Sequence, residues 1–171
     1  KHLLLKELEE LIQMKLDRML FTNPDRINYY ERYQQIIDDY YSEQDRATIE
    51  KTFMDLMDLA NSMNQEEQRY AREGFTSDEE LSLYDMLFRE DLSKNDIKKL
   101  KEVAADLLSK IKNKISDLDQ WTDKQKPEST VDNLIRDTLW AELPECYDEV
   151  SISVYRQQIY EYVYTRYKEV A

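Results

Sequence analysis

The chain has 171 residues, of which 41% are hydrophobic and 36% are charged, and its formal net charge is −13. A chain of this size and composition can bury a core, but its single glycine and single cysteine exclude glycine-rich phosphate loops, internal disulfides and cysteine-based zinc sites. No apolar run approaches the roughly 18 residues of a membrane span, so we expect no membrane partner and no signal peptide.

The only cysteine, Cys146, suits a reducing, cytoplasmic setting. Because the chain begins at Lys1 and not at a methionine, we expect it to be a piece of a longer protein or to carry a joined sequence at its start. Whether Lys1 and His2 are native therefore stays open.

The first half of the chain is predicted to form three helices, because apolar residues recur at helical spacing and no segment alternates with the period of a strand. The first helix covers residues 3–20, and its predicted inward residues are Leu5, Leu8, Ile12, Leu16 and Met19. Asn23 and Pro24 form a helix start. The second helix reaches residue 41, with Tyr30, Tyr33, Ile37 and Tyr40 on its inward face. A long third helix ends near residue 73, where Gly74 suits the position just after a helix.

The second half is predicted to form four more helices. Ser77 and Glu80 have the spacing of a capping box and open the fourth helix, whose predicted inward residues are Leu81, Tyr84 and Phe88. Ser93 opens the fifth, and its apolar stripe is the steadiest in the chain: Ile97, Leu100, Ala104, Leu107, Ile111, Ile115 and Leu118. Residues 121–130 are predicted to be a loop, followed by helices over 131–143 and 151–168, with Pro144 ending the first of them.

These elements predict an all-α fold, an irregular multi-helix bundle of about six to eight helices. Nothing in the sequence marks a firm domain boundary, so residues 1–171 are predicted to be a single domain, with residues 1–22 as a candidate linking helix.

The sequence offers little catalytic chemistry. His2 is the only histidine, which leaves catalytic triads, Cys–His pairs and histidine-based zinc or di-iron motifs without their ligands. The 37 acidic residues could supply a carboxylate pair for acid–base chemistry, although solvated helix faces explain them more simply. We therefore predict no catalytic residue, no metal site and no cofactor in this chain.

Positive charge is concentrated in one window. Residues 94–126 contain nine lysines and six acidic residues, which leaves a net charge of −16 for the remainder. On a helical wheel Lys94, Lys98, Lys101 and Lys112 share one flank of the fifth helix, and Lys99, Lys110 and Lys114 share the other. Two interpretations stay open, lysines that extend from beside a core stripe and a row that contacts phosphates. The candidate DNA contacts are Lys94, Lys98, Lys101, Lys112, Lys124 and Lys126.

Large aromatic residues are assigned mainly to packing. Trp121 and Trp140 are each predicted to lie in the core or to pack between domains, and a partner contact stays open for Trp121 because it lies beside the loop that contains Pro127. Tyr84 falls on the inward face of its helix, so its hydroxyl is expected to find a hydrogen-bond partner.

A family resemblance joins several of these segments. Residues 74–87 resemble the "G-L-t-x-E-E-x-x-F/L-Y-D-x-L" region near the C-terminus of the motor (restriction) subunits of type I restriction–modification enzymes. The residues that carry its motif, together with the proline stop, are Gly74, Ser77, Glu80, Tyr84, Asp85 and Pro144. The sequence departs from the family pattern at Phe75, where leucine is commoner, and at residues 130–132, where basic residues are expected.

Further segments resemble the same family in order along the chain. Residues 121–125 resemble its W-T-D-K run, residues 135–145 its next helix and proline stop, and residues 160–167 its terminal helix. Asn23, Pro24, Arg26 and Tyr33 resemble its opening. On this resemblance the candidate partner contacts are Trp121, Asp123, Tyr164 and Arg166.

The resemblance implies a C-terminal helical module of a larger bacterial, cytoplasmic subunit. That parent subunit would be an ATP- and Mg²⁺-dependent endonuclease and DNA translocase, whose motifs this chain lacks. The implied partners are the modification and specificity subunits of the methyltransferase, the helicase domains of the same subunit and double-stranded DNA. We therefore expect a non-catalytic module that docks the motor onto the methyltransferase core and contributes to DNA binding. The alternative is a purely structural support for the motor lobes.

Overall fold

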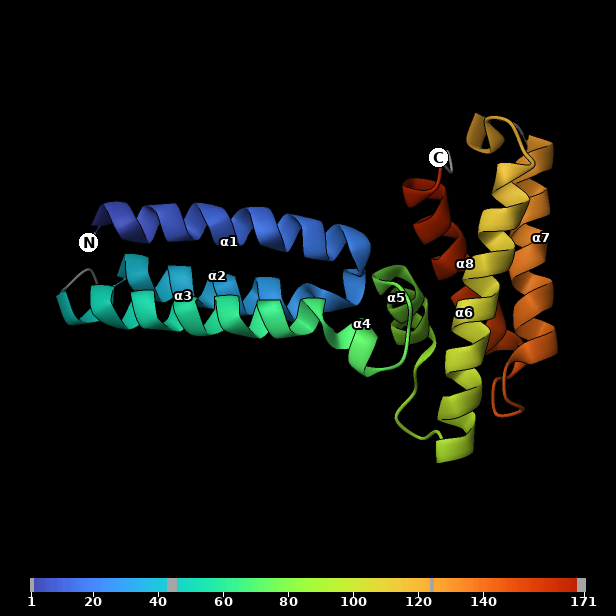
Figure 1. The fold of residues 1–171 in the computed structure, drawn as a ribbon, viewed down its shortest axis with the longest axis horizontal. Coiled ribbons are helices and arrows are strands. Elements are labelled where there is room, and N and C mark those ends of the chain that lie inside the picture. Colours follow the sequence, from blue (N-terminus) through green and yellow to red (C-terminus); the bar gives the residue numbers. More distant parts are fainter. Residues whose placement is uncertain (1, 43–45, 124, 169–171) are drawn as a thin grey trace. The chain divides into compact units, whose positions relative to one another are not determined.

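The computed structural model describes residues 2–42, 46–123 and 125–168. Within these ranges the chain forms eight α-helices and two short 3₁₀ helices, and no strand (Figure 1). The all-α prediction and the expected number of helices are therefore confirmed. None of the helices in the described ranges is long and apolar enough to cross a membrane. The chain divides into two compact units, residues 1–78 and 79–171. The grouping of both units into one domain, with residues 1–22 as a linking helix, stays a prediction.

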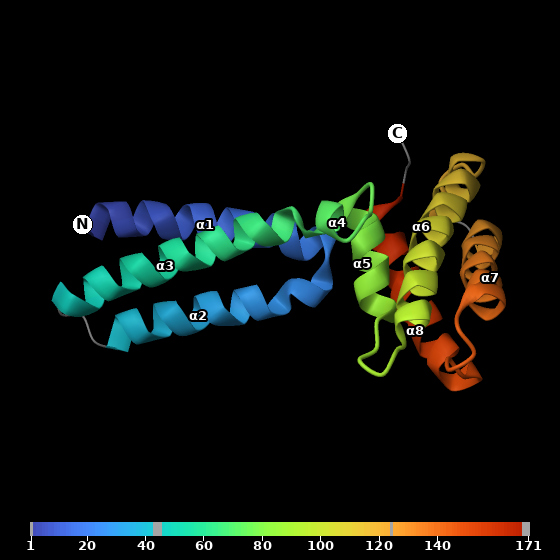
Figure 2. The ribbon, with the colours of Figure 1, turned by 60° about the horizontal axis from the view of Figure 1, so that its bottom comes forward.

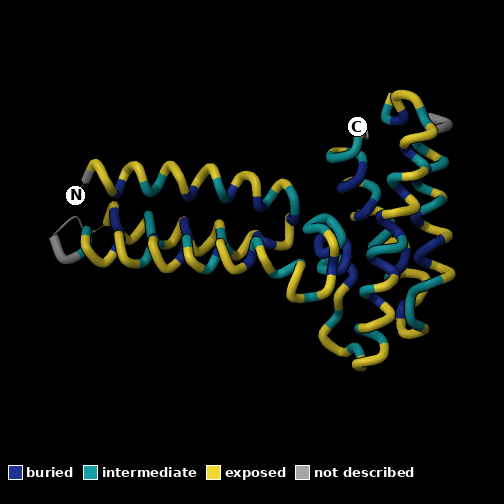
Figure 3. The backbone as a smooth tube through the Cα atoms, in the orientation of Figure 1, coloured by how far each residue is buried: buried dark blue, intermediate teal, exposed yellow. Residues whose placement is uncertain are grey.

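The first unit is built on three long helices, α1 (His2–Thr22), α2 (Ile27–Ser42) and α3 (Arg46–Glu67). α1 and α3 run in the same direction and α2 runs in the opposite direction (Figures 1 and 2). Buried positions recur at helical intervals along all three (Figure 3). They form one hydrophobic core that consists of Leu5, Ile12, Leu16, Met19, Tyr33, Tyr40, Leu56, Leu59 and Met63.

The inward face predicted for the first helix is confirmed, since four of its five residues are buried and Leu8 packs against the core. One prediction for the second helix is wrong. Tyr30 is 44% exposed, because the inward face of α2 is centred on Tyr33 and Tyr40, and Tyr30 lies at its edge. Tyr33 and Tyr40 are seven residues apart, which is close to two helical turns.

The predicted start of the second helix is confirmed, with one added turn. Asn23 has an extended backbone, and its side-chain oxygen accepts a hydrogen bond from the N–H of Asp25 at 3.1 Å. Pro24 occupies the first position of a 3₁₀ helix, η1 (Pro24–Arg26), where the missing N–H costs no hydrogen bond. η1 then leads directly into α2.

The third helix is shorter than predicted. α3 ends at Glu67, and a short helix, α4 (Arg69–Arg72), follows Gln68. At Gln68 the backbone has φ −98° and ψ −3°, and its N–H bonds to the carbonyl of Gln65 at 3.1 Å. This is the tighter three-residue spacing of a 3₁₀ turn. The apolar pattern used for the prediction carries no signal of such a local change.

The predicted role of Gly74 at the helix end is confirmed. Gly74 has φ +88°, and its N–H bonds to Ala71 while the N–H of Phe75 bonds to Tyr70, at 3.1 and 2.9 Å. These two bonds define a Schellman motif, which closes the last turn of α4. The only glycine of the chain is therefore used at a position that needs a left-handed backbone.

The second unit begins one residue into α5 (Asp78–Leu87) and contains four helices and one 3₁₀ turn. They are α5, α6 (Lys94–Ser116), η2 (Trp121–Asp123), α7 (Gln125–Glu142) and α8 (Glu149–Arg166). α7 packs against both α6 and α8. The predicted stripe of α6 is confirmed, because its five central residues are buried and Ile97 and Leu118 are half-buried. Phe88, predicted to point inward, is 41% exposed and lies just beyond the end of α5.

The predicted loop over residues 121–130 is largely helical. Residues 121–123 form η2, and α7 begins at Gln125, six residues earlier than expected. Pro127 is the third residue of α7, and a proline is tolerated there because the first N–H groups of a helix have no intrahelical partner. The other end is as predicted, since α7 ends two residues before Pro144.

Candidate functional site

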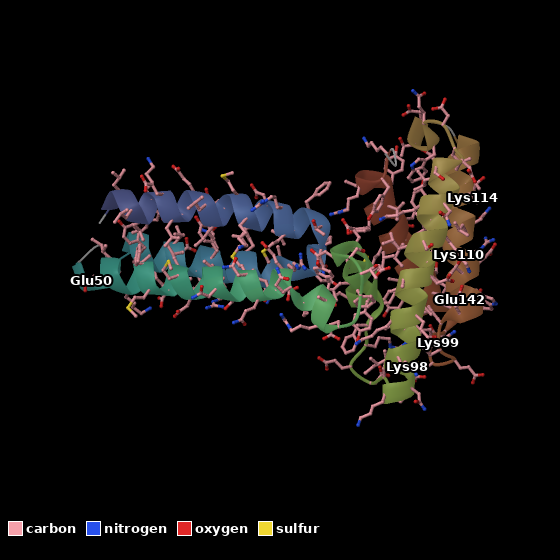
Figure 4. The ribbon with its side chains drawn as sticks, in the orientation of Figure 1. Glu50, Lys98, Lys99, Lys110, Lys114 and Glu142 are labelled. Atoms are coloured by element: carbon pink, nitrogen blue, oxygen red, sulfur yellow. The ribbon has the colours of Figure 1, made fainter. Side chains whose placement is uncertain are left out.

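α6 is the element that displays the lysines of the basic window. It carries seven lysines and three acidic residues. Ser93 begins the helix, because its hydroxyl oxygen accepts the N–H of Asp96 at 3.1 Å. The buried stripe that faces α7 and the rest of the unit leaves the lysines on the sides and outer surface. Figure 4 shows four of them, Lys98, Lys99, Lys110 and Lys114, distributed along the length of the helix.

The flank predicted to contact DNA contains two kinds of lysine. Lys94 and Lys98 are exposed and form no ion pair among the described residues. Lys101 and Lys112 are half-buried, and their ammonium nitrogens lie 5.8 and 5.7 Å from the ring centres of Tyr84 and Tyr167. Both distances are within cation–π range. Lys101 and Lys112 are thus held against aromatic rings, as lysines beside a core stripe are, whereas Lys94 and Lys98 extend into solvent.

The opposite flank of α6 is partly neutralised. Lys110 lies 3.0 Å from a carboxylate oxygen of Asp106 and 2.7 Å from Glu142 of α7 (Figure 4). Hydrogen bonds to Glu142 and Asp106 raise the pKa of Lys110, and the bond with Lys110 lowers the pKa of Asp106. The positive charge of Lys110 is therefore largely balanced by the two carboxylates beside it. Of the remaining candidates, Lys124 and the side chain of Lys126 lie outside the described part of the chain.

Trp121 is the centre of an aromatic cluster at the end of α8. Its side chain has no exposed surface, and its indole N–H donates to the carbonyl of Tyr167 at 2.6 Å. The rings of Tyr160 and Tyr164 approach it edge-on, with centroids 6.2 and 5.7 Å away. The packing role predicted for Trp121 is confirmed. A contact between this ring and a partner stays a prediction, and the closed cluster gives it no exposed surface to use.

The other candidate partner contacts surround this cluster. The Tyr164 hydroxyl donates to the carbonyl of Thr122 at 3.2 Å, which ties η2 to α8. The Arg166 guanidinium lies 4.2 Å from the ring centre of Tyr162, and burial lowers the pKa of Arg166. Asp123 is exposed. The structure thus brings Trp121 and Tyr164 together and leaves Asp123 with the most accessible side chain of the four.

Trp140 is not in the core, so that part of the prediction is wrong, and its packing against another domain stays a prediction. It is 63% exposed on the outer side of α7. It lies beside a hollow of about 390 Å³ between α7 and α8, together with Arg136, Ile152 and Arg156. Trp140 follows Leu139 directly, and it is Leu139 that points inward with no exposed surface. Because consecutive side chains of a helix point in different directions, the inward position of Leu139 directs Trp140 away from the core.

A buried charge cluster in the first unit was invisible to sequence patterns. The Arg26 side chain is 2% exposed and donates to Glu66 at 2.9 Å and to Asp78 at 2.5 Å. Glu66 also accepts from Arg69 at 2.8 Å. Burial would lower the pKa of Arg26, but the hydrogen bonds to Asp78 and Glu66 outweigh it and raise this pKa. Arg26 was noted in the sequence only through the family resemblance.

No group of three or more histidine, cysteine or acidic side chains in the described ranges is arranged to hold a metal ion.

Comparison with known protein families identifies the family of this chain. A family model described as "Type I restriction enzyme HindI endonuclease subunit-like, C-terminal" matches residues 1–159. The chain belongs to this family. No curated protein and no solved structure matches it.

The resemblance predicted from motifs is confirmed, and most of its segments fall within the matched residues. The restriction-subunit motif at residues 74–87 coincides with the Schellman turn and α5. Ser77 directly precedes α5, Glu80 is its third residue, and both have interactions with neighbours. The reciprocal bonds of a capping box stay a prediction. Tyr84 is buried beneath Lys101, and Asp85 is half-buried. The segment 160–167 lies beyond the match.

Proposed function

We propose that this restriction-subunit domain is a non-catalytic assembly module that docks the motor onto the methyltransferase core and also contacts DNA. The observation that carries the proposal is family membership combined with the exposed lysines of α6 in a chain of net charge −13. The parent subunit is proposed to supply the ATP- and Mg²⁺-dependent chemistry.

The DNA contact is assigned to the flank that begins with Lys94 and Lys98. Both side chains are exposed and unpaired among the described residues, so each can neutralise a phosphate without first breaking an ion pair. Lys110 on the opposite flank must release Asp106 and Glu142 before it can do so. Variants of these lysines and of Lys110 remove the same charge from the same helix, so a comparison of the two distinguishes specific phosphate contacts from a general effect of positive charge.

The experiment uses the complete restriction subunit assembled with its methyltransferase. Lys94→Gln and Lys98→Gln are each expected to lower the slope of log K against log salt by about one, because each removes one phosphate contact. Lys110→Gln is the matched control on the same helix and is expected to leave the slope unchanged. Equal slopes for all three variants and the unmodified enzyme would remove DNA contact from the proposal.

Docking is tested separately by deleting the module from the complete subunit. Loss of complex formation with an intact ATPase activity is the expected result.

The alternative function, structural support of the motor lobes, is favoured by the acidic net charge of the chain, which opposes phosphate binding. It predicts instead that the deletion unfolds the motor lobes and abolishes the ATPase activity.

A further inference from the structure

An apolar groove lies between α1 and α3 in the first unit. Its hollow has a volume of about 470 Å³ and is lined by Leu4, Ile49, Glu50, Phe53 and Met54. Three of its apolar side chains are exposed, Leu4 at 58%, Phe53 at 38% and Met54 at 67%, and Ile49 is half-buried against the core. Leu11 and Met57 extend the surface along each helix, at 63% and 41% exposed. Contiguous exposed apolar surface of this kind marks an interaction site.

α1 and α3 leave between them a groove that a further helix could occupy. α1 and α3 run side by side in the same direction, and α2 packs against both of them (Figures 1 and 2). One hydrophobic core joins the three helices. A helix laid into the α1–α3 groove would complete a four-helix bundle, whose members pack along such seams.

The spacing of the exposed residues matches a helical partner. On α1 Leu4 and Leu11 are separated by seven residues, an interval of a helix–helix seam. On α3 Phe53 and Met57 are four residues apart and therefore lie on one side. The distance from Leu4 to Leu11 is about 10 Å along the axis, which a partner helix of about two turns would cover.

The charges beside the groove are acidic. Glu7 lies between Leu4 and Leu11 at helical spacing and is exposed. Glu50 lines the hollow. The lysine nearest along this side of α1, Lys15, is already paired with Glu67 of α3 at 3.5 Å. This rim repels phosphates and attracts a partner that carries lysine or arginine next to its apolar residues.

We infer that the α1–α3 groove receives an amphipathic helix of the methyltransferase core, with basic residues flanking its apolar face. The inference rests on the proposed docking function and assigns that docking to one surface. The apolar contacts supply most of the affinity, as in other helix-in-groove interfaces. The acidic rim contributes the rate of association and its salt dependence.

The test places a charge in the groove of the complete restriction subunit and measures binding to the purified methyltransferase. Leu11→Asp and Met54→Asp are each expected to raise the Kd at least about tenfold, the effect of losing a central apolar contact. Val150→Asp and Val154→Asp are matched controls, because these valines are 74% and 49% exposed on α8. They are expected to change the Kd less than about twofold.

Rim charges give a second readout. Reversing Glu7 and Glu50 to lysine is expected to lower the association rate and to flatten its dependence on salt, while the dissociation rate changes little. An association rate that keeps the salt dependence of the unmodified subunit would contradict the basic character assigned to the partner.

A photo-crosslinking residue at Met54 identifies the occupant even if a charged variant fails to fold. Capture of a methyltransferase helix with basic flanks supports the inference. Capture only of the motor lobes or of a second copy of the subunit overturns it, as does an unchanged Kd in both groove variants. These outcomes leave the docking function standing. The docking function itself fails only if the subunit that lacks the whole module still binds the methyltransferase.

Discussion

Arg26 makes the most connections of any buried polar side chain described in the first unit. It joins η1 to Glu66 at the end of α3 and to Asp78, which closes the unit. Its partners lie 40 and 52 residues away in the sequence. Because a buried charge without a partner is costly, each of these residues depends on the others. The cluster therefore fixes the geometry at one end of the three-helix unit.

The titration of Glu66 should make this cluster sensitive to acid. Burial raises the pKa of Glu66, but hydrogen bonds from Arg69 and Arg26 outweigh it and hold the pKa below its ordinary value of 4.5. A depressed pKa in the folded state stabilises the protein above the unfolded value, and this stability is lost as the pH falls below about 4.5. We expect Glu66→Gln to lower the free energy of unfolding by about 2 kcal/mol at pH 7 and by progressively less below pH 4.5.

The measurement is urea unfolding of both proteins at several pH values between 7 and 3. Glu67→Gln is the control, because Glu67 is more exposed and lies 3.5 Å from Lys15. Its difference from the unmodified protein should stay within about 0.5 kcal/mol. A difference for Glu66→Gln that does not vary with pH would show that its charge is not stabilised by the cluster.

The two tryptophans form a natural contrast between a packed and an exposed ring. Trp121→Ala is expected to cost about 3–5 kcal/mol, since it leaves a cavity and an unpaired carbonyl at Tyr167. Trp140→Ala is expected to stay within about 0.5 kcal/mol. Denaturant unfolding measures both changes. Fluorescence of the single-tryptophan variants adds an independent check, because acrylamide should quench Trp140 strongly and Trp121 weakly. Equal quenching would contradict the burial of Trp121.

At the scale of the helix, the turn at Gly74 shows how local rules act on this chain. The Schellman bonds need a left-handed residue after α4, and the φ of +88° is strained for any residue with a Cβ. A Cβ added at Gly74 would meet no neighbouring atom within 4 Å. The cost of a substitution there is therefore conformational and involves no steric clash with the surroundings.

Gly74→Ala is accordingly expected to lower the free energy of unfolding by about 1–2 kcal/mol. Gly74→Asn should cost less, because asparagine adopts the left-handed conformation more readily. Thermal unfolding of the three proteins gives the order. An alanine variant as stable as the asparagine variant would mean that the turn rearranges when the glycine is replaced.

Periodicity predicted the helices well and their ends less well. The stripe of α6 and the inward face of α1 follow directly from apolar spacing, because burial on one side imposes that spacing. The start of α7 was missed because Pro127 was interpreted as a loop residue, although a first turn accepts it. Exposed Trp140 was missed because size favours burial, whereas the helical phase set by Leu139 places it outside.

At the scale of the whole molecule, the sites divide into those that sequence patterns contain and those that they do not. The lysine row of α6 was predictable because a helix converts spacing into a flank. The ties of Lys101 and Lys112 to Tyr84 and Tyr167 were not, since they depend on how α6 packs against other elements. The α1–α3 groove and the Arg26 cluster were also hidden, because each joins segments about 40 to 50 residues apart.

The two proposed binding surfaces differ in charge. The chain as a whole is acidic, while α6 has an excess of lysine. A basic helix in an acidic molecule gives one direction of approach to a polyanion and disfavours the others. The α1–α3 groove of the first unit has an acidic rim and therefore favours a basic partner. The variants on α6 and in the groove therefore test two contacts of one assembly without overlapping.

The aromatic cluster around Trp121 has a practical consequence for choosing where a recombinant version of the domain should stop. The family match ends at residue 159, but Tyr160, Tyr164 and the carbonyl of Tyr167 all touch the indole of Trp121. Trimming the chain to the matched boundary would strip the ring of its cover and remove the last two turns of α8. The cooperative folding unit therefore extends at least eight residues past the edge that homology alone suggests.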